Sequence, residues 1–270
     1  MKKSFFFLHY GPGGNCDAER SYFGDLPFKD HFYFWDQPAT KTFDELLDAT
    51  AEEFERYTRN NQCLGIVGHS FGCDLAAALM KYLSIKKIAP ADLIFIAPIP
   101  NLISAFKNLG QRVARQNDLH ADVRAALQEK LLKLSKATNN VQALWDFVFT
   151  IYGYPNVGRL FWSNAKAFEN FVGRSSAFRA VDLATWQSVL TDYIQNHKAA
   201  LSKESLASFA SKTKVYVGEE DPYLDAATGA TFWNKILVAQ NVMNVSLAGH
   251  HPHLEKPSNF FKFLGPIDDK

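Results

Sequence analysis

The sequence has little of several features that would assign it to a class at once. Its 29 basic and 28 acidic residues leave a formal charge of +1, and like charges form only short runs. This balance gives no indication of a nucleic-acid or anionic membrane surface. No stretch approaches the roughly 20 apolar residues that a membrane-spanning helix needs. The three cysteines, Cys16, Cys63 and Cys73, match no metal or redox spacing and favour a reducing, cytoplasmic location.

The N-terminus shows only part of the pattern of a signal peptide. The charged start Met1-Lys2-Lys3 and the apolar residues up to Leu8 resemble the beginning of one. The apolar run is short, however, and residues 9–14 interrupt it without a small-residue cleavage site. We therefore predict a buried strand here, with a signal peptide as the alternative.

What the sequence does contain is an alternation of short apolar runs with longer helical patterns. Continuous apolarity is typical of parallel strands that are covered on both faces. The alternation predicts an α/β fold, a three-layer sandwich around a mostly parallel sheet of about six strands. The predicted strands are residues 4–9, 31–35, 63–68, 92–97, 214–218 and 244–249, and the predicted helices are 42–57, 71–83, 226–238 and 256–263. Thr42 is the expected N-cap of the first helix, with Glu45 three residues later.

Residues 101–211 break this alternation, because they contain no convincing strand and are too many for a loop. We predict five helices, 102–115, 118–135, 141–151, 160–171 and 176–201, in an insertion over one end of the sheet. Residues 1–100 and 212–270 would form the core. We expect most aromatic residues of the insertion in its interior and a minority at a cleft. They are Trp145, Phe147, Phe149, Tyr152, Tyr154, Phe161, Trp162, Phe168, Phe171, Phe178, Trp186 and Tyr193.

Gly68-His69-Ser70-Phe71-Gly72 carries the Gly-x-Ser-x-Gly pattern between a predicted strand and a strong helix former. The pattern alone is weak, but its context is specific. A sharp strand-to-helix turn would hold Ser70 in a strained conformation, and a Cβ at Gly68 or Gly72 would crowd that turn. The Phe71 N–H begins the helix, where the helix dipole favours negative charge, so it is a candidate oxyanion donor.

A serine hydroxyl needs a base to become a nucleophile, and the base needs a carboxylate to orient it. Three histidines, His250, His251 and His253, follow the last predicted strand. Asp221 follows the strand before it, with Glu219 and Glu220 as alternatives closer to the strand end. Because ligands bind at the carboxyl ends of strands in open α/β sheets, these residues can meet Ser70 there.

These residues resemble the α/β-hydrolase superfamily, in its branch with a helical cap, over most of residues 4–100 and 213–265. Ser70, Asp221 and His250 follow its nucleophile-acid-base order. Residues 68–72 resemble its nucleophile elbow, Gly218-x-x-Asp221 its acid turn, and residues 249–255 its histidine loop. The resemblance implies that residues 101–211 are a cap, and the spacing to Glu255 selects His250 as the base. Glu255 itself is expected to steady the last helix.

His9-Tyr10-Gly11-Pro12-Gly13-Gly14 is similar to the His-Gly-Gly-Pro-Gly-Gly oxyanion loop of the superfamily. The resemblance implies that the N–H of Gly11 is the second oxyanion donor, since Pro12 has no N–H. Tyr10 replaces the usual glycine, so we expect its ring at the cleft. The antiparallel strand pair that usually precedes this loop is missing.

Other polar residues have less specific interpretations. His69 is a second candidate for contact with a ligand, with packing as the alternative, and His9 is expected to hydrogen-bond its own loop. His251 and His253 are expected to be a surface residue and a partner of local backbone. We expect no metal, because His-x-Pro-His lacks helical ligand spacing and has no obvious third ligand. No phosphate-binding or dinucleotide pattern occurs, so no cofactor is expected.

The resemblance implies a serine hydrolase that cleaves an ester-like bond of a small, apolar substrate through an acyl-enzyme. A thioesterase, a C–C bond hydrolase, a peptidase or an acyltransferase would use the same residues. The alternative from another class is a non-catalytic ligand-binding protein of the same fold. The sequence does not indicate an oligomeric state.

Overall fold

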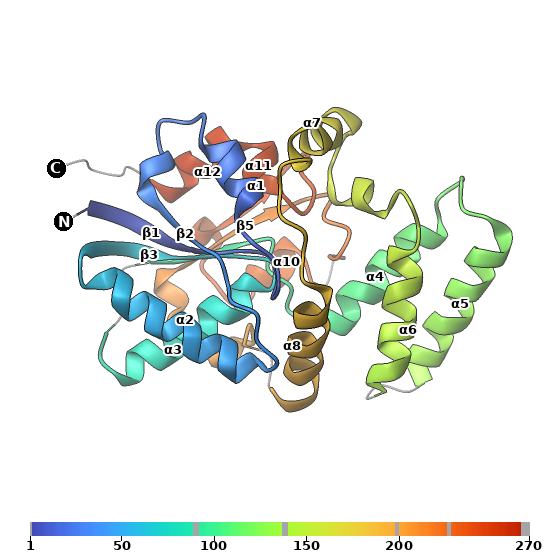
Figure 1. Ribbon diagram of the computed structural model, residues 1–270, viewed down its shortest axis with the longest axis horizontal. Coiled ribbons are helices and arrows are strands. Elements are labelled where there is room, and N and C mark those ends of the chain that lie inside the picture. The colour runs from blue at the N-terminus through green and yellow to red at the C-terminus, as the bar shows by residue number, and fades with distance from the viewer. Residues whose placement is uncertain (1, 89–91, 137–139, 198–199, 226–227, 266–270) are drawn as a thin grey trace.

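A six-stranded sheet is the centre of the computed structural model, which describes residues 2–88, 92–136, 140–197, 200–225 and 228–265. The strand order is β2-β1-β3-β4-β5-β6, and every neighbouring pair is parallel. All carboxyl ends therefore lie at one edge of the sheet (Figure 1). The strands are β1 (Lys2–Leu8), β2 (Phe32–Trp35), β3 (Asn61–His69), β4 (Asp92–Ile96), β5 (Thr213–Gly218) and β6 (Val242–Val245).

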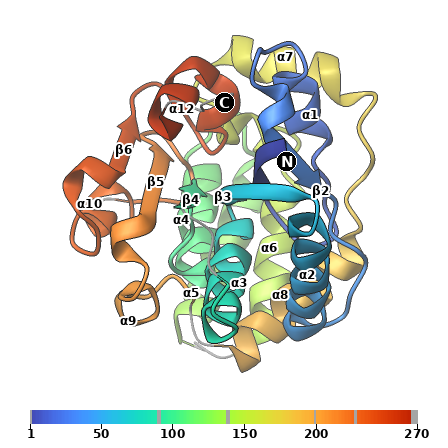
Figure 2. The same cartoon turned by 90° about the vertical axis from the view of Figure 1, so that its left-hand side faces the viewer.

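Helices cover both faces of the sheet, which explains the unbroken apolar runs. Figure 2 shows α2 and α3 on one face and α1 and α12 on the other. In β1, Phe6 and Phe7 point to opposite faces and both are fully buried. The three-layer α/β prediction is thus confirmed. The core helices are α1 (Asp17–Phe23), α2 (Phe43–Thr58), α3 (Gly72–Ile85), α10 (Ala230–Trp233), α11 (Pro252–Glu255) and α12 (Pro257–Leu264), with the 3-10 turns η1 (Lys29–His31) and η4 (Ala239–Asn241).

The apolar start of the chain belongs to the sheet. The segment weighed as a signal peptide forms β1, hydrogen-bonded between β2 and β3. Within the described residues, no helix has the length and apolarity needed to cross a membrane. Thr42 caps α2 as predicted, because its side chain accepts the Glu45 N–H at 3.2 Å.

Two predicted core elements were wrong in extent. The last strand ends at Val245 instead of reaching residue 249, because the N–H groups of Glu219 and Glu220 bond the carbonyls of Val245 and Ala248 and hold this stretch as a turn. The predicted helix 226–238 reduces to the single turn α10, since a turn around Asp225 delays its start. Residues 226 and 227 lie outside the described residues. Sequence analysis did not predict α1.

Between β4 and β5, the described residues of segment 101–211 form helices. Those of residues 102–175 lie beyond the carboxyl ends of the strands (Figure 1), whereas residues 203–212 lead into the amino end of β5. Three predicted helices begin later than expected. The helix predicted from residue 118 begins at residue 121, and the side chains of Asn164 and Asp182 cap the other two. Residues 198 and 199 of the last predicted helix lie outside the described residues. The helices are α4 (Leu102–Ala114), α5 (Ala121–Lys136), α6 (Val141–Tyr152), α7 (Ala165–Ser175), α8 (Leu183–Asn196) and α9 (Lys203–Leu206), with η2 (Val157–Phe161) and η3 (Ala210–Lys212).

Helix α8 is tied to the core by buried polar contacts. The Tyr193 hydroxyl donates to the Asp74 carboxylate on α3, and both residues are buried. The Phe43 N–H at the start of α2 donates to Asp192 Oδ2 at 2.8 Å. Burial raises the pKa of Asp74 to about 7, because the charged form loses its hydration.

This pKa makes a prediction about stability. Because Asp74 holds its proton more tightly in the folded than in the unfolded chain, its stabilising effect is fully present below about pH 4 and is lost as pH rises to about 7. In urea denaturation, the free energy of unfolding of the wild type should therefore fall relative to Asp74→Asn across this window, by a few kcal/mol. Asp48→Asn, on the exposed face of α2, is the matched control and should not reproduce the trend. A constant difference between wild type and Asp74→Asn would contradict the prediction.

Candidate active site

Ser70 occupies the turn between β3 and α3 with φ of +56°, in the left-handed region that a non-glycine residue rarely adopts. Its N–H donates to the Ile96 carbonyl at 2.8 Å, which fixes the turn against β4. The glycines on either side are required by contact. A Cβ on Gly68 would lie 2.3 Å from the Gly72 carbonyl oxygen, and one on Gly72 would lie 2.5 Å from the carbonyl oxygen of Leu8. The predicted sharp turn is therefore present.

The structure brings Ser70, Asp221 and His250 together in one hydrogen-bonded chain. His250 Nε2 lies 2.9 Å from Ser70 Oγ, and His250 Nδ1 lies 2.7 Å from Asp221 Oδ2. Because a carboxylate only accepts, Nδ1 carries the ring proton and Nε2 can accept from the serine hydroxyl. All three side chains are buried, with Asp221 only 1% exposed. Glu219 and Glu220, the alternative acids, take no part in this chain.

The loops that carry the acid and the base are fixed by polar residues from elsewhere. The Arg112 guanidinium of α4 donates to the Asp221 carbonyl at 3.1 Å. Glu255 accepts the Gly249 N–H at 2.6 Å and the Ser163 N–H at 2.9 Å, so it ties the histidine loop to segment 101–211. Glu255 was expected to steady the last helix instead. Arg112 had no local signal in the sequence, because its partner lies more than a hundred residues away.

The two predicted oxyanion donors do not converge in this structure. The Phe71 N–H donates to the Tyr10 carbonyl at 3.2 Å. No described peptide is cis, so the Gly11 N–H, which shares a planar peptide with that carbonyl, points in the opposite direction. Phe71 and Gly11 are therefore adjacent to the serine turn, but one N–H is occupied and the other is turned away.

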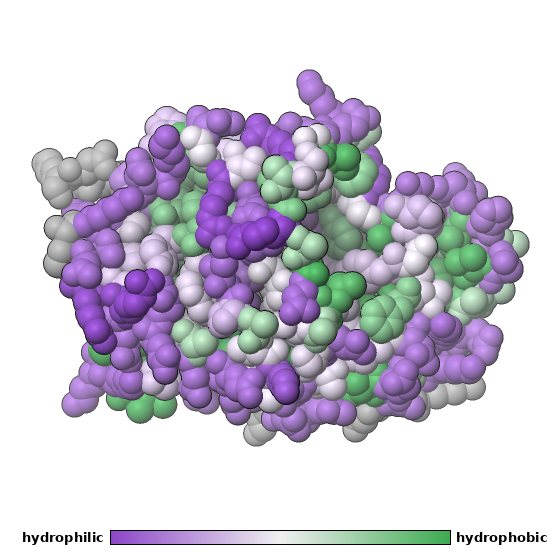
Figure 3. Space-filling view, in the orientation of Figure 1, coloured by the Kyte–Doolittle hydropathy of each residue, from purple (hydrophilic) through white to green (hydrophobic). Residues whose placement is uncertain are grey.

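A cavity of about 730 Å³ opens onto Ser70 and His250. Figure 3 shows a hollow with hydrophobic residues around it, between α7, α8 and the lobe of α4 to α6. Most aromatic residues of segment 101–211 line the cavity, so the expectation that only a minority would do so was wrong. The lining aromatics of this segment are Phe106, Phe149, Tyr152, Phe161, Trp162, Phe168, Phe171, Phe178 and Trp186, whereas Trp145, Phe147, Tyr154 and Tyr193 are buried elsewhere.

The cavity wall has few charged groups. Arg179 lies at its rim, but its guanidinium already pairs with Asp17 at 2.5 Å and Asp36 at 2.7 Å. Glu19 is buried at 1% exposure and pairs with histidines. Ser70 and His250 therefore lie at one end of an apolar cavity. Among the described lining residues, Glu19 and Arg179 are already paired, which disfavours a strongly ionic ligand.

Of the two other residues predicted at the cleft, one lines the cavity and one does not. Tyr10 lines the cavity as expected, and burial raises the pKa of its hydroxyl. His69 does not line it, because its ring is fully buried and turned toward Glu19. His251 lines the cavity, although it was expected at the surface, and His253 faces Glu19, not local backbone.

His9 also has a different partner from the one expected. Its Nε2 accepts the Gln37 N–H at 3.2 Å, after β2, instead of bonding its own loop. Burial lowers the pKa of His9 to about 4, so the ring stays neutral at physiological pH.

No protein-family model matches the chain, and no curated protein matches it in sequence. Its structure is similar to the proline iminopeptidase-related protein from Thermus thermophilus, with a TM-score of 0.60 and 19% identity over 97% of this chain and 87% of that one. It is also similar to a serine hydrolase from the polyaromatic hydrocarbon-degrading bacterium Cycloclasticus zankles (TM-score 0.57, 15% identity, 97% and 89% covered). A thermophilic esterase from Thermogutta terrifontis gives a TM-score of 0.56 and 14% identity, with 97% and 88% covered. The sheet topology and these similarities show that the chain has the α/β-hydrolase fold.

The backbone of Ser70 predicts an unusual order of stability. A left-handed conformation costs an L-residue roughly 1–2 kcal/mol, which glycine avoids, although glycine loses about 0.5–1 kcal/mol more chain entropy on folding. We expect Ser70→Gly to be more stable than Ser70→Ala by about 1 kcal/mol in urea denaturation. The same pair at Ser188, inside α8, should give the opposite order, because glycine disfavours a helix interior. A less stable Ser70→Gly would contradict the strained turn.

Proposed function

We propose that the protein is a serine hydrolase that cleaves an ester-like bond of an apolar small molecule through an acyl-enzyme. The observation that carries the proposal is the hydrogen-bonded chain from Asp221 through His250 to Ser70, which ends at an apolar cavity. A pure binding protein would have no need of this chain. An esterase and a serine hydrolase among the similar structures support the same class.

In the proposed reaction each group has one role. Ser70 Oγ attacks the substrate carbonyl while His250 Nε2 takes its proton, and a tetrahedral intermediate forms. His250 then gives that proton to the leaving alcohol, and the acyl group stays on Ser70. A water molecule, deprotonated by His250, attacks the acyl carbon and releases the acid. Asp221 holds the Nδ1–H tautomer and stabilises the imidazolium during both steps.

An oxyanion needs N–H groups that point toward it, and in this structure the N–H groups of Phe71 and Gly11 do not point to one place. Rotation of the single peptide between Tyr10 and Gly11 would remove the Tyr10 carbonyl from the Phe71 N–H and turn the Gly11 N–H toward the same place. We infer that substrate binding drives this rotation, since an oxyanion would replace the Tyr10 carbonyl as the acceptor for Phe71. The glycine at position 11 allows it, because a residue without Cβ tolerates both peptide orientations.

The cavity indicates which substrates fit. Its aromatic wall favours an aromatic or branched apolar group, and the pairing of Arg179 leaves no free cation for a substrate carboxylate. We propose that segment 101–211 acts as the cap that selects this group, with residues 1–100 and 212–270 as the catalytic core. Thioester, amide and C–C bond cleavage and acyl transfer would use the same three residues.

A covalent probe tests the nucleophile. A fluorophosphonate should add its mass to Ser70, and Ser70→Ala should remove both the labelling and the hydrolysis of aryl esters, with a loss on the order of 10⁶ in turnover. Ser84→Ala, on the exposed end of α3, is the control and should label and react like the wild type. A loss of less than about tenfold in Ser70→Ala would remove Ser70 from the mechanism.

The structure of the phosphonylated enzyme tests the peptide rotation. The phosphonyl oxygen stands in for the oxyanion, so the N–H groups of Phe71 and Gly11 should both lie about 2.7–3.1 Å from it. The Tyr10 carbonyl should no longer contact Phe71. An adduct in which Tyr10 still accepts the Phe71 N–H would show that the oxyanion is held by other donors.

A further inference from the structure

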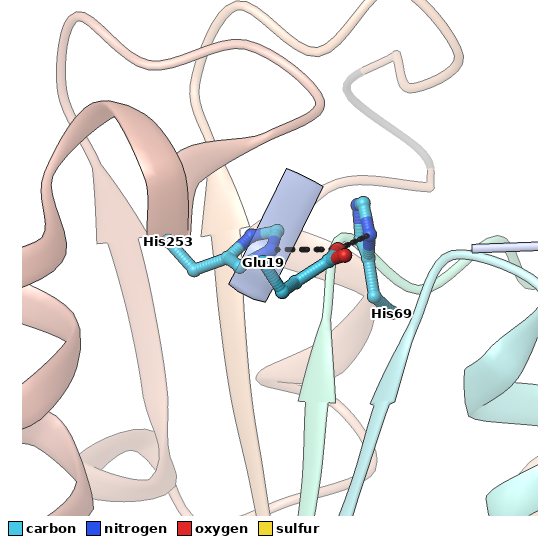
Figure 4. A group of neighbouring side chains, drawn as sticks. All are labelled: Glu19, His69 and His253. Atoms are coloured by element: carbon cyan, nitrogen blue, oxygen red, sulfur yellow. Dashed lines mark hydrogen bonds and ion pairs between the residues drawn. The ribbon is translucent and has the colours of Figure 1, made fainter. Parts of the chain in front are cut away.

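Behind the active site, three side chains from distant parts of the chain converge on one buried point. Figure 4 shows Glu19 of α1 between His69, at the end of β3, and His253 of α11. Glu19 Oε1 lies 3.5 Å from His69 Nδ1 and 3.4 Å from His253 Nε2. The three donor atoms lie within 4.8 Å of one another. Exposure is 1% for Glu19 and 0% for both histidines.

The hydrogen bond that His69 makes through Nε2 leaves a lone pair on Nδ1, which points toward the Glu19 carboxylate. His69 Nε2 lies 3.0 Å from the His250 carbonyl oxygen, which can only accept, so Nε2 carries the proton. In the neutral ring, Nδ1 then presents its lone pair to Glu19 Oε1. Two buried electron-rich atoms that face each other are stabilised by a cation between them, either a proton or a metal ion.

The distances bear on the choice between these cations. A proton shared by an imidazolium and a carboxylate would draw the heavy atoms to about 2.7–2.9 Å. The observed separations of 3.4 and 3.5 Å are longer than that. Donor atoms bound to one zinc ion at about 2.0–2.1 Å lie about 3.3–3.4 Å apart in a tetrahedron, and about 2.9 Å apart in an octahedron. The two separations from Glu19 Oε1 are close to those of neighbouring ligands of a tetrahedral ion, and the two imidazole nitrogens lie within 4.8 Å of each other.

We propose that Glu19, His69 and His253 form a binding site for one zinc ion. Two imidazoles and one carboxylate are a ligand set that zinc uses in proteins. The bond from His69 Nε2 to a backbone carbonyl is the support that metal-bound histidines commonly have, because it fixes the ring and its tautomer. Glu19 also lines the cavity, which gives the ion a path of entry.

The site contradicts the expectation of no metal drawn from the sequence, and the reason is spatial. Along the chain, His251-Pro252-His253 offers no ligand spacing, and the partners of His253 lie on α1 and β3. Within the part of the chain that the structure describes, other buried polar atoms around the site also lack hydrogen-bond partners. Glu19 Oε2, His9 Nδ1 and His253 Nδ1 are buried and without a hydrogen-bond partner among the described residues.

A bound ion would affect the position of the histidine loop. The His69 ring joins the ion to the backbone carbonyl of His250, so a bound ion would hold the histidine loop from behind. Neither His69 nor His253 lines the cavity, whereas Glu19 does, so the ion would lie behind the cavity wall and not on the side of Ser70 that faces the substrate. Metal binding and hydrolysis can therefore be tested separately.

Cobalt is the probe, because tetrahedral Co²⁺ absorbs visible light far more strongly than the octahedral hydrated ion. The full-length protein is stripped with a chelator, dialysed and titrated with Co²⁺, and then with Zn²⁺ by calorimetry and by displacement of the cobalt spectrum. We expect one ion per chain and an intense tetrahedral spectrum that zinc abolishes. Uptake of less than one equivalent, or an octahedral spectrum, would overturn the proposal on the wild type alone.

Matched variants locate the ion. Glu19→Gln keeps the size of the side chain, His253→Asn shortens it, and each removes a ligand, so each should weaken zinc affinity by at least about 100-fold. His120→Asn, at an exposed histidine, should bind like the wild type. Equal affinity in all three variants, with native circular dichroism, would place the ion elsewhere and overturn the site. Fluorophosphonate labelling of Ser70 is measured in parallel, so failure of the metal site and failure of the proposed hydrolase are distinguishable.

Discussion

The close approach of the backbone around Ser70 is the constraint on which the rest of the site depends. β1, β3 and α3 pack so tightly that a Cβ on Gly68 or Gly72 would overlap neighbouring carbonyl groups. This packing holds Ser70 in its left-handed conformation and directs the hydroxyl into the cavity at the edge of the sheet. It also brings the carbonyls at the end of β1 against the first turn of α3. The nucleophile and the glycine loop that follows β1 are consequently one packed unit.

The sequence was a good guide where the physical cause is local. Strands covered on both faces become continuous apolar runs, and Thr42 with Glu45 three residues on marks a helix start within one turn. The starts of α7 and α8 were misplaced although their caps, Asn164 and Asp182, are also local. The apolar residues before each cap continue a helical period, but several of them line the cavity instead of a helix face.

The candidate site shows the same difference between features with a local cause and features with a long-range cause. Ser70, Asp221 and His250 could be placed from sequence, because each lies in the turn or loop after a strand and parallel strands bring their carboxyl ends to one edge. The Glu19 cluster could not, since its three members lie on α1, β3 and α11 and no spacing links them. The orientation of the peptide after Tyr10 was equally out of reach, because a sequence pattern identifies a donor but not the direction in which it points.

One contact between the two parts of the chain limits how freely the protein can change its specificity. The N–H of Asp182, at the start of α8, donates to the Gly13 carbonyl at 2.8 Å, and a Cβ on Gly13 would lie 2.3 Å from the Asp182 carbonyl oxygen. Segment 101–211, which lines much of the cavity, thus also supports the glycine loop beside Ser70. Replacing that segment with one from a relative, to exchange substrates, would disturb the loop unless the new backbone rebuilt this contact. The lining of the cavity and the loop beside Ser70 therefore form a single mechanical unit.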